Sequence, residues 1–163
     1  MILKIEKGSD NKILRAPCKD VKEFTKTTAA LIKDMKLTQV AAQGVGIAAN
    51  QVGLNDRLAI ITVGVKKMIP IINPYILEYS EETNVAEEGC LSLPGKWAPV
   101  RRSNEVALKY QDAHGKEIVM RFIGFEARIV QHEVDHLNGK LFIDRVAATD
   151  LHLVAGNKQK DFE

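Results

Sequence analysis

The chain has 163 residues, a length that fits one domain with a single buried core. Its composition is 45% hydrophobic and 27% charged, which is an ordinary globular balance. With 23 basic and 21 acidic residues, the net charge of +2 is too small to indicate a nucleic-acid-binding or membrane-binding surface. We therefore expect one domain over residues 1–163, with no nucleic-acid or membrane partner.

The cysteine count and the start of the chain indicate a reducing compartment. Two cysteines, Cys18 and Cys90, are too few for a disulfide scaffold in a chain of this length. Residues 1–14 are interrupted by charges and lack the apolar core of a secretory signal. The longest apolar run, at 58–65, is too short to span a bilayer. We expect a cytoplasmic protein, or one inside an organelle if the source is a eukaryote.

In chain order, the first periodic segment is 20–36, which predicts a helix. Asp20 is expected to cap this helix, with Glu23 at the spacing of a capping box. Residues 57–64 predict a strand. Residues 70–79 are also apolar, but their two prolines predict an edge strand or an irregular one.

The second half of the chain predicts a hairpin and then a helix. Apolar residues alternate on both sides of a turn in 105–122, as in a β-hairpin. A helix is expected from about 125 to 138, and Gly139 follows it where glycine ends many helices. The tail, 145–163, is polar after Val154, and we expect it to be partly helical or frayed. Strands followed by a late helix indicate an α+β fold, with antiparallel β-sheets packed around a central helix.

The helix at 125–138 carries the sequence QHEVDH, which has the pattern H-E-x-x-H. His132 and His136 lie one turn apart on one face, an arrangement that binds a single metal ion. Glu133 lies on the same flank, where it is placed to act on a water at the metal. The opposite side of the helix is apolar, with Val130, Val134 and Leu137. Because apolar residues also share the histidine side, we expect the helix to be central rather than peripheral.

Two further charges on this helix lie outside the expected ligand set. Asp135 lies toward the polar side, where it either orients a neighbouring group or is solvated. Arg128 lies on the flank near the ligands, and we expect its stem to line a pocket wall while its guanidinium points outward. A guanidinium turned inward would make that pocket more polar.

Two histidines need a third ligand, and Cys90 in EEGCLSLP (87–94) offers a thiolate suited to zinc or iron. Three protein ligands leave an open position, as catalytic sites do. The stretch GVGIAANQ (44–51) fits G-x-G-x-x-A, but it follows a helix and lacks a later ribose-binding acid, which excludes a dinucleotide site. We expect its glycines to let the backbone approach a ligand. Gln51 is then an oxyanion donor or a satisfied core amide.

Together, GVGIAANQ, EGCLS and HEVDH resemble the motifs of the peptide deformylase family in order and spacing. The resemblance covers nearly the whole chain, as far as residue 144. It implies a hydrolase that removes the formyl group from the N-terminal formylmethionine of new polypeptides and releases formate. It also implies that Cys90, His132 and His136 hold one metal ion. The implied working metal is Fe²⁺, which Zn²⁺, Ni²⁺ or Co²⁺ can replace, although the ligand set alone suits zinc.

The same resemblance assigns roles to other residues. Glu133 would transfer protons, while the Gln51 amide and the Leu91 backbone N–H would stabilise the oxyanion. Arg102 would reach the substrate beyond its methionine. The implied substrate-binding residues are Gly44, Val45, Gly46, Gly89, Arg102, Phe125 and Ile129. The implied partners are N-formylmethionyl peptides and the ribosome near its exit tunnel.

Two other functions remain as alternatives. A zincin-like metallopeptidase shares H-E-x-x-H but usually takes a downstream histidine or glutamate, and His152 is the sole histidine after His136. An inactive metal-binding interaction module would need a fourth protein ligand, for which Cys18 is the candidate. Such a module would have no use for Glu133, so we favour the deformylase.

Overall fold

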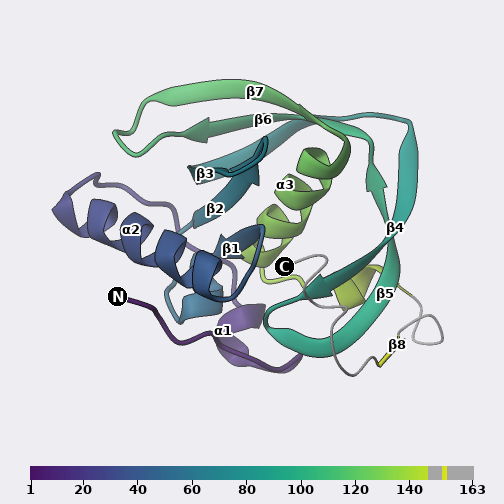
Figure 1. The fold of residues 1–163 in the computed structure, drawn as a ribbon. Helices are drawn as coiled ribbons and strands as arrows, with labels where there is room; N and C mark the ends of the chain where they lie inside the picture. Colours follow the sequence, from purple (N-terminus) through teal and green to yellow (C-terminus); the bar gives the residue numbers. More distant parts are fainter. Residues whose placement is uncertain (147–151, 154–163) are drawn as a thin grey trace.

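The computed structural model describes residues 1–146, 152 and 153, and consists of two antiparallel β-sheets with helix α3 (Gly124–Leu137) between them (Figure 1). The larger sheet contains, in spatial order, β1 (Gly46–Ala48), β2 (Leu58–Val63), β3 (Lys67–Tyr79), β6 (Glu105–Gln111) and β7 (Glu117–Ile123). The smaller sheet contains β4 (Thr83–Cys90), β5 (Leu93–Ser103) and β8 (His152–Leu153). This confirms the α+β fold with a central helix.

The remaining helices lie around these sheets. They are α1 (Lys12–Arg15), α2 (Lys26–Ala41) and the two 3-10 helices η1 (Ala49–Val52) and η2 (Phe142–Arg145). Apart from residues 145, 146 and β8, the predicted tail lies outside the described residues. None of the described helices has both the length and the apolar character needed to cross a bilayer.

Helix α2 begins later than the sequence predicts. Its cap is Thr25, whose side chain and that of Thr28 form the capping box, so the prediction that Asp20 caps a helix starting there is wrong. Residues 20–25 precede the helix as an irregular segment, and Val21 pairs instead with the side chain of Asn73. A distant tertiary contact therefore overrides the local capping signal.

Strand β3 lies inside the larger sheet, between β2 and β6, so the edge position predicted for 70–79 is wrong. The predicted irregularity is confirmed, because the register with β6 shifts between Ile72 and Tyr75. Pro74 lies within that shift, and Asn73 before it has a φ of 51°. The bulge accommodates a proline that cannot donate to the ladder. The predicted β2 strand and the β6–β7 hairpin are both confirmed.

Strand β2 is buried on both faces, which explains its continuous apolar sequence. Ala59 and Ile61 pack in the cluster with α3, whereas Leu58 and Ile60 pack in the cluster with α2. Helix α3 is thereby held against the sheet from one side. Its buried residues Val130, Val134 and Leu137 fill this interface, as predicted. The helix ends before Gly139, whose φ of +76° suits glycine at this position.

Candidate metal centre and active site

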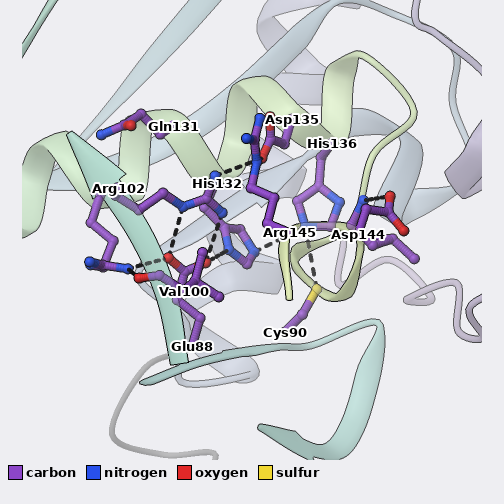
Figure 2. Close-up of polar contacts among 12 residues, drawn as sticks. Glu88, Cys90, Val100, Arg102, Gln131, His132, Asp135, His136, Asp144 and Arg145 are labelled. Carbon is purple, nitrogen blue, oxygen red and sulfur yellow. Dashed lines mark hydrogen bonds and ion pairs between the residues drawn. The ribbon is translucent and has the colours of Figure 1, made fainter. Parts of the chain in front are cut away.

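Three side chains from two elements meet at the centre of the molecule (Figure 2). Cys90 ends strand β4, and His132 and His136 lie one turn apart on α3. The Nε2 atoms of the two histidines are 3.1 Å apart, and Cys90 Sγ lies 3.3 Å from His136 Nε2. All three ligand atoms lie within 4.8 Å of one another, and all three residues are buried. The predicted ligand set is thus brought together in space.

The geometry of this cluster fits a single tetrahedral metal ion. Metal–nitrogen and metal–sulfur bonds of roughly 2.0–2.3 Å place tetrahedral ligand atoms about 3.3–3.6 Å apart. Two of the three separations, 3.1 and 3.3 Å, are close to this range, and the third, between Cys90 Sγ and His132, is within 4.8 Å. A ligand imidazole must also be neutral. Burial lowers the pKa of His136 well below its ordinary value and so keeps that ring neutral.

Glu88 fixes the orientation of His132. Its Oε1 lies 2.9 Å from His132 Nδ1, which leaves Nε2 directed toward the cluster (Figure 2). Burial raises the pKa of Glu88, but hydrogen bonds from Arg102 and His132 outweigh this effect and hold the pKa well below its usual range. A carboxylate behind a ligand histidine fixes the tautomer and increases ligand basicity. Glu88 therefore belongs to the site, although the sequence analysis did not identify it.

Glu133 lies next to the ligands and is only 2% exposed. Its Oε2 has no hydrogen-bond partner among the described residues. Burial raises the pKa of Glu133 to about 7, while the nearby His132 opposes the rise. A buried carboxyl group with a pKa near neutrality can accept and return a proton. This is the behaviour expected of a general base and acid.

Gln51 and Leu91 border the cluster from two short segments. The Oε1 of Gln51 accepts from the Ala48 backbone N–H at 2.9 Å, which fixes the direction of the amide. Its Nε2 lies 3.1 Å from Ser92 Oγ and 3.6 Å from Cys90 Sγ. The amide is therefore satisfied by the protein and also faces the ligand sulfur. Leu91 directly follows the ligand Cys90 and is 7% exposed.

A small cavity opens beside His132 and Glu133. Its walls are mainly apolar, with three acidic or basic side chains, those of Glu88, Arg128 and Glu133. The remaining lining residues are Val45, Glu88, Gly89, Phe125, Arg128 and Ile129. A mostly apolar cavity with a few fixed polar groups next to titratable residues is typical of a substrate site.

Two strand edges that pair with no other strand of the described residues flank this cavity. Strand β1 is at the edge of the larger sheet, and β4 is at the edge of the smaller one. Val45 directly precedes β1 and Gly89 lies in β4, so both edges reach the cavity wall. An extended peptide can pair with such edges through its backbone.

A family model described as polypeptide deformylase matches residues 2–152. The chain belongs to the polypeptide deformylase family. It is 46% identical over 146 residues to the peptide deformylase of Halothermothrix orenii, covering 89% of this chain and 94% of that one. It is 43% identical over 137 residues to that of Pseudothermotoga lettingae, covering 84% and 79%. As a member of this family, the chain is a hydrolase that removes N-formyl groups from nascent peptides.

Solved deformylase structures share the fold. The peptide deformylase of Thermotoga maritima superposes with a TM-score of 0.86 at 40% identity, covering 90% of this chain and 99% of that one. The class I type b peptide deformylase from Acinetobacter baumannii, solved with Met-Ala-Ser bound, has a TM-score of 0.84 at 36% identity, with the same coverage. These matches set aside the metallopeptidase and the inactive module.

Arg102 is buried behind the ligand cluster, whereas the sequence analysis expected it to reach the substrate. The residue is 3% exposed, and its guanidinium donates to Glu88 at 2.8 and 2.9 Å and to Asp135 at 2.7 Å (Figure 2). Asp135 in turn accepts from Arg145 at 2.5 and 2.7 Å. Arg102 therefore holds Glu88 behind His132, and Asp135 orients a neighbouring group rather than being solvated.

Arg128 also departs from the expected orientation. Its guanidinium turns inward and the residue is only 4% exposed, so it does not extend to the surface. The guanidinium forms an ion pair with Glu88, the same carboxylate that Arg102 contacts, and Arg128 Nη1 lies 2.6 Å from Glu88 Oε2. Phe125, by contrast, is 51% exposed although it lines the same cavity. The cavity therefore has an open aromatic rim and a buried polar wall.

Gly46 is required by its contact with Glu133. A Cβ at Gly46 would overlap the Glu133 carboxylate, coming within 2.9 Å of Cδ. We expect Gly46→Ala to displace this carboxylate and to reduce kcat/KM for a formylated peptide by at least roughly tenfold, as small misplacements of reacting groups do. A thermal melt would check that the fold is retained. Unchanged kcat/KM would show that Glu133 does not need its present position.

Cys18 lies outside the metal cluster, which among the described residues consists of Cys90, His132 and His136. Burial raises the pKa of the Cys18 thiol to about 11. The thiolate is the reactive form, and a pKa raised by about two units lowers the thiolate fraction about 100-fold relative to an ordinary cysteine at the same pH. We expect Cys18 to react slowly with a thiol reagent at pH 8, faster toward pH 11, and equally with or without metal. Rapid metal-dependent labelling would make Cys18 a ligand candidate again.

Proposed function

We propose that the chain hydrolyses the formamide bond of N-formylmethionyl peptides at a single metal ion held by Cys90, His132 and His136. When bound there, a divalent metal supplies Lewis acidity, which lowers the pKa of a water molecule and polarises a carbonyl oxygen. The observation that carries the proposal is the ligand cluster itself, with the unpartnered Glu133 Oε2 beside it. Three protein ligands leave room for chemistry, as catalytic sites do.

Glu133 is the proposed proton carrier. It takes a proton from the water that attacks the formyl carbon, and it later delivers that proton to the nitrogen of the leaving amine. The C–N bond then breaks to give formate and a free N-terminus. The pKa of about 7, which burial produces, suits both steps near neutral pH.

Gln51 and Leu91 are the proposed donors to the oxygen that becomes negative during attack. Backbone and amide N–H groups aimed at a developing oxyanion stabilise it strongly, because they need no reorganisation. The Ala48 contact fixes the Gln51 amide with its Nε2 toward the ligand sulfur. To donate to the oxyanion, Gln51 would exchange its contact with Cys90 or Ser92 for the new one.

The proposed substrate lies as an extended strand between β1 and β4. Gly44, Val45 and Gly46 would pair with its backbone on one side and Gly89 on the other. The methionine side chain would enter the cavity lined by Val45, Phe125 and Ile129. The Acinetobacter baumannii enzyme was solved with Met-Ala-Ser, which is what remains of a formylated tripeptide after formate leaves.

We propose Fe²⁺ as the working metal, with Zn²⁺, Ni²⁺ or Co²⁺ able to replace it. One thiolate and two imidazoles suit each of these ions, so ligand type alone does not select among them. A ferrous ion beside a thiolate requires reducing conditions. That requirement and the bacterial relatives support a cytoplasmic location.

The test is formate release from formyl-Met-Ala-Ser. The protein is purified without oxygen, loaded separately with Fe²⁺, Zn²⁺, Ni²⁺ or Co²⁺, and its metal content is measured. We expect stoichiometric metal binding and the highest turnover with Fe²⁺, with turnover lost on chelation and restored by Fe²⁺. No formate release from protein with a filled site would contradict the proposed function.

A further inference from the structure

The guanidinium of Arg128 is anchored in the wall of the substrate cavity. Its Nη1 donates to Glu88 Oε2 at 2.6 Å and to the Val100 carbonyl at 2.9 Å. Its Nη2 donates to the Asn84 carbonyl at 3.1 Å and to Asn84 Oδ1 at 2.6 Å. These four hydrogen bonds use all four N–H groups of the two terminal nitrogens. The guanidinium is therefore fixed in position without help from a ligand.

One donor of Arg128 remains. A guanidinium has five N–H groups, and the fifth is on Nε. Among residues 1–146, 152 and 153, the side-chain hydrogen bonds of Arg128 come from Nη1 and Nη2, and none comes from Nε. A donor that makes no hydrogen bond within the described part of the protein and belongs to a residue of the cavity wall can meet an acceptor from a ligand or water.

The residues around this donor make it selective. Arg128 lines the cavity together with Val45, Phe125 and Ile129, whose side chains are apolar and accept no hydrogen bond. Among the other polar wall groups, Glu88 and His132 already bond to each other, and the Glu133 carboxylate, when ionised, can accept but not donate a hydrogen bond. An occupant of the cavity thus meets apolar side chains and the Glu133 carboxylate, and Arg128 is the wall residue that can offer it a hydrogen-bond donor. Among apolar side chains of this length, methionine alone carries an acceptor, its thioether sulfur.

We propose that Arg128 determines specificity by donating its Nε–H to the sulfur of the substrate methionine. This inference rests on the proposed function, since it assumes that the methionine side chain enters this cavity. It adds a reason why the chain would distinguish methionine from norleucine, which has a methylene in place of the sulfur. Apolar contact alone discriminates weakly between two side chains of such similar shape.

The test variant is Arg128→Lys, because lysine places a methylene where arginine has Nε and still carries a positive charge toward Glu88. Values of kcat/KM are measured for formyl-Met-Ala-Ser and formyl-norleucyl-Ala-Ser with the same enzyme sample. The wild type is expected to prefer methionine roughly two- to tenfold, the range of one net hydrogen bond. The preference should fall to about one in Arg128→Lys. Because the ratio is taken within each protein, altered metal content or folding cancels.

Phe125→Leu is the matched control, because it changes the apolar wall and leaves every donor in place. Both kcat/KM values should fall in this variant while their ratio stays at the wild-type value. The proposal is overturned if Arg128→Lys keeps the wild-type ratio, or if Phe125→Leu shifts it equally. Wild-type protein that releases no formate from either peptide would instead contradict the proposed function, so the two failures are distinguishable.

Discussion

Replacing Glu133 with glutamine is expected to leave the metal bound and to reduce turnover by roughly 10²–10⁴-fold, the usual contribution of a general acid–base group. Glutamine has nearly the shape of glutamate but cannot carry the proton from water to the leaving amine. Glu133 is not one of the three residues of the described ligand cluster, so its replacement removes chemistry rather than coordination. The measurement is formate release at saturating Fe²⁺, with metal content determined on the same sample.

Glu126→Gln is the control for this variant. Glu126 lies about two turns earlier on the same helix and accepts a hydrogen bond from the Gly64 backbone, away from the cluster. The same chemical change there should leave metal content and turnover near wild type. If Glu133→Gln retained full turnover, Glu133 would have no part in proton transfer. If it lost the metal, Glu133 would have to be a ligand or to support one.

The sequence predicts helix α3 and its ligands because their signals are local. The H-E-x-x-H spacing and the glycine after the helix all lie within sixteen residues, and the structure confirms each. Helix α2 shows the limit of such local reasoning. Asp20 and Glu23 have the spacing of a capping box, but Thr25 and Thr28 form it. Two competing local signals differ by only a few tenths of a kcal/mol, so tertiary contacts decide between them.

The carboxylate behind the ligands could not be derived from local signals alone. Glu88 receives hydrogen bonds from residues 14 and 40 positions away, and it contacts His132 44 positions away. Which arginine reaches a buried carboxylate depends on strand pairing and helix packing, which no short motif encodes. One signal was present, because Glu88 and Cys90 alternate on the same strand and so tend to share a face. That spacing could have suggested Glu88 as a partner of the ligands.

Glu88 connects Arg128 in the cavity wall to His132 in the ligand cluster. Its Oε1 contacts His132, and its Oε2 contacts Arg128. Arg102 bonds to both oxygens, which locks the carboxylate in one orientation. A single buried carboxylate thus positions both a metal ligand and a cavity-wall residue. A change at Arg128 can therefore also alter the contact between Glu88 and His132. For this reason the test of Arg128 uses a ratio of substrates rather than an absolute rate.

Replacing Cys90 with alanine is expected to abolish both metal binding and turnover. Cys90 supplies the only thiolate of the described cluster, and alanine leaves two histidines to hold the ion. Losing an outer partner of a ligand typically costs about 10–100-fold in metal affinity, and losing the ligand itself should cost more. The measurements are metal content after gel filtration, and formate release with excess Fe²⁺. A melt checks that the fold survives the smaller side chain.

Cys18→Ala provides the same substitution at the second thiol. Because Cys18 is not part of the cluster, this variant should bind one metal ion per chain and release formate like the wild type. Full metal occupancy in Cys90→Ala would contradict the ligand assignment. Loss of metal in both variants would indicate that both thiols coordinate the ion. Four protein ligands would leave no open position, as in a structural site. The expected contrast between the two cysteines therefore tests whether this site keeps a position for water and substrate.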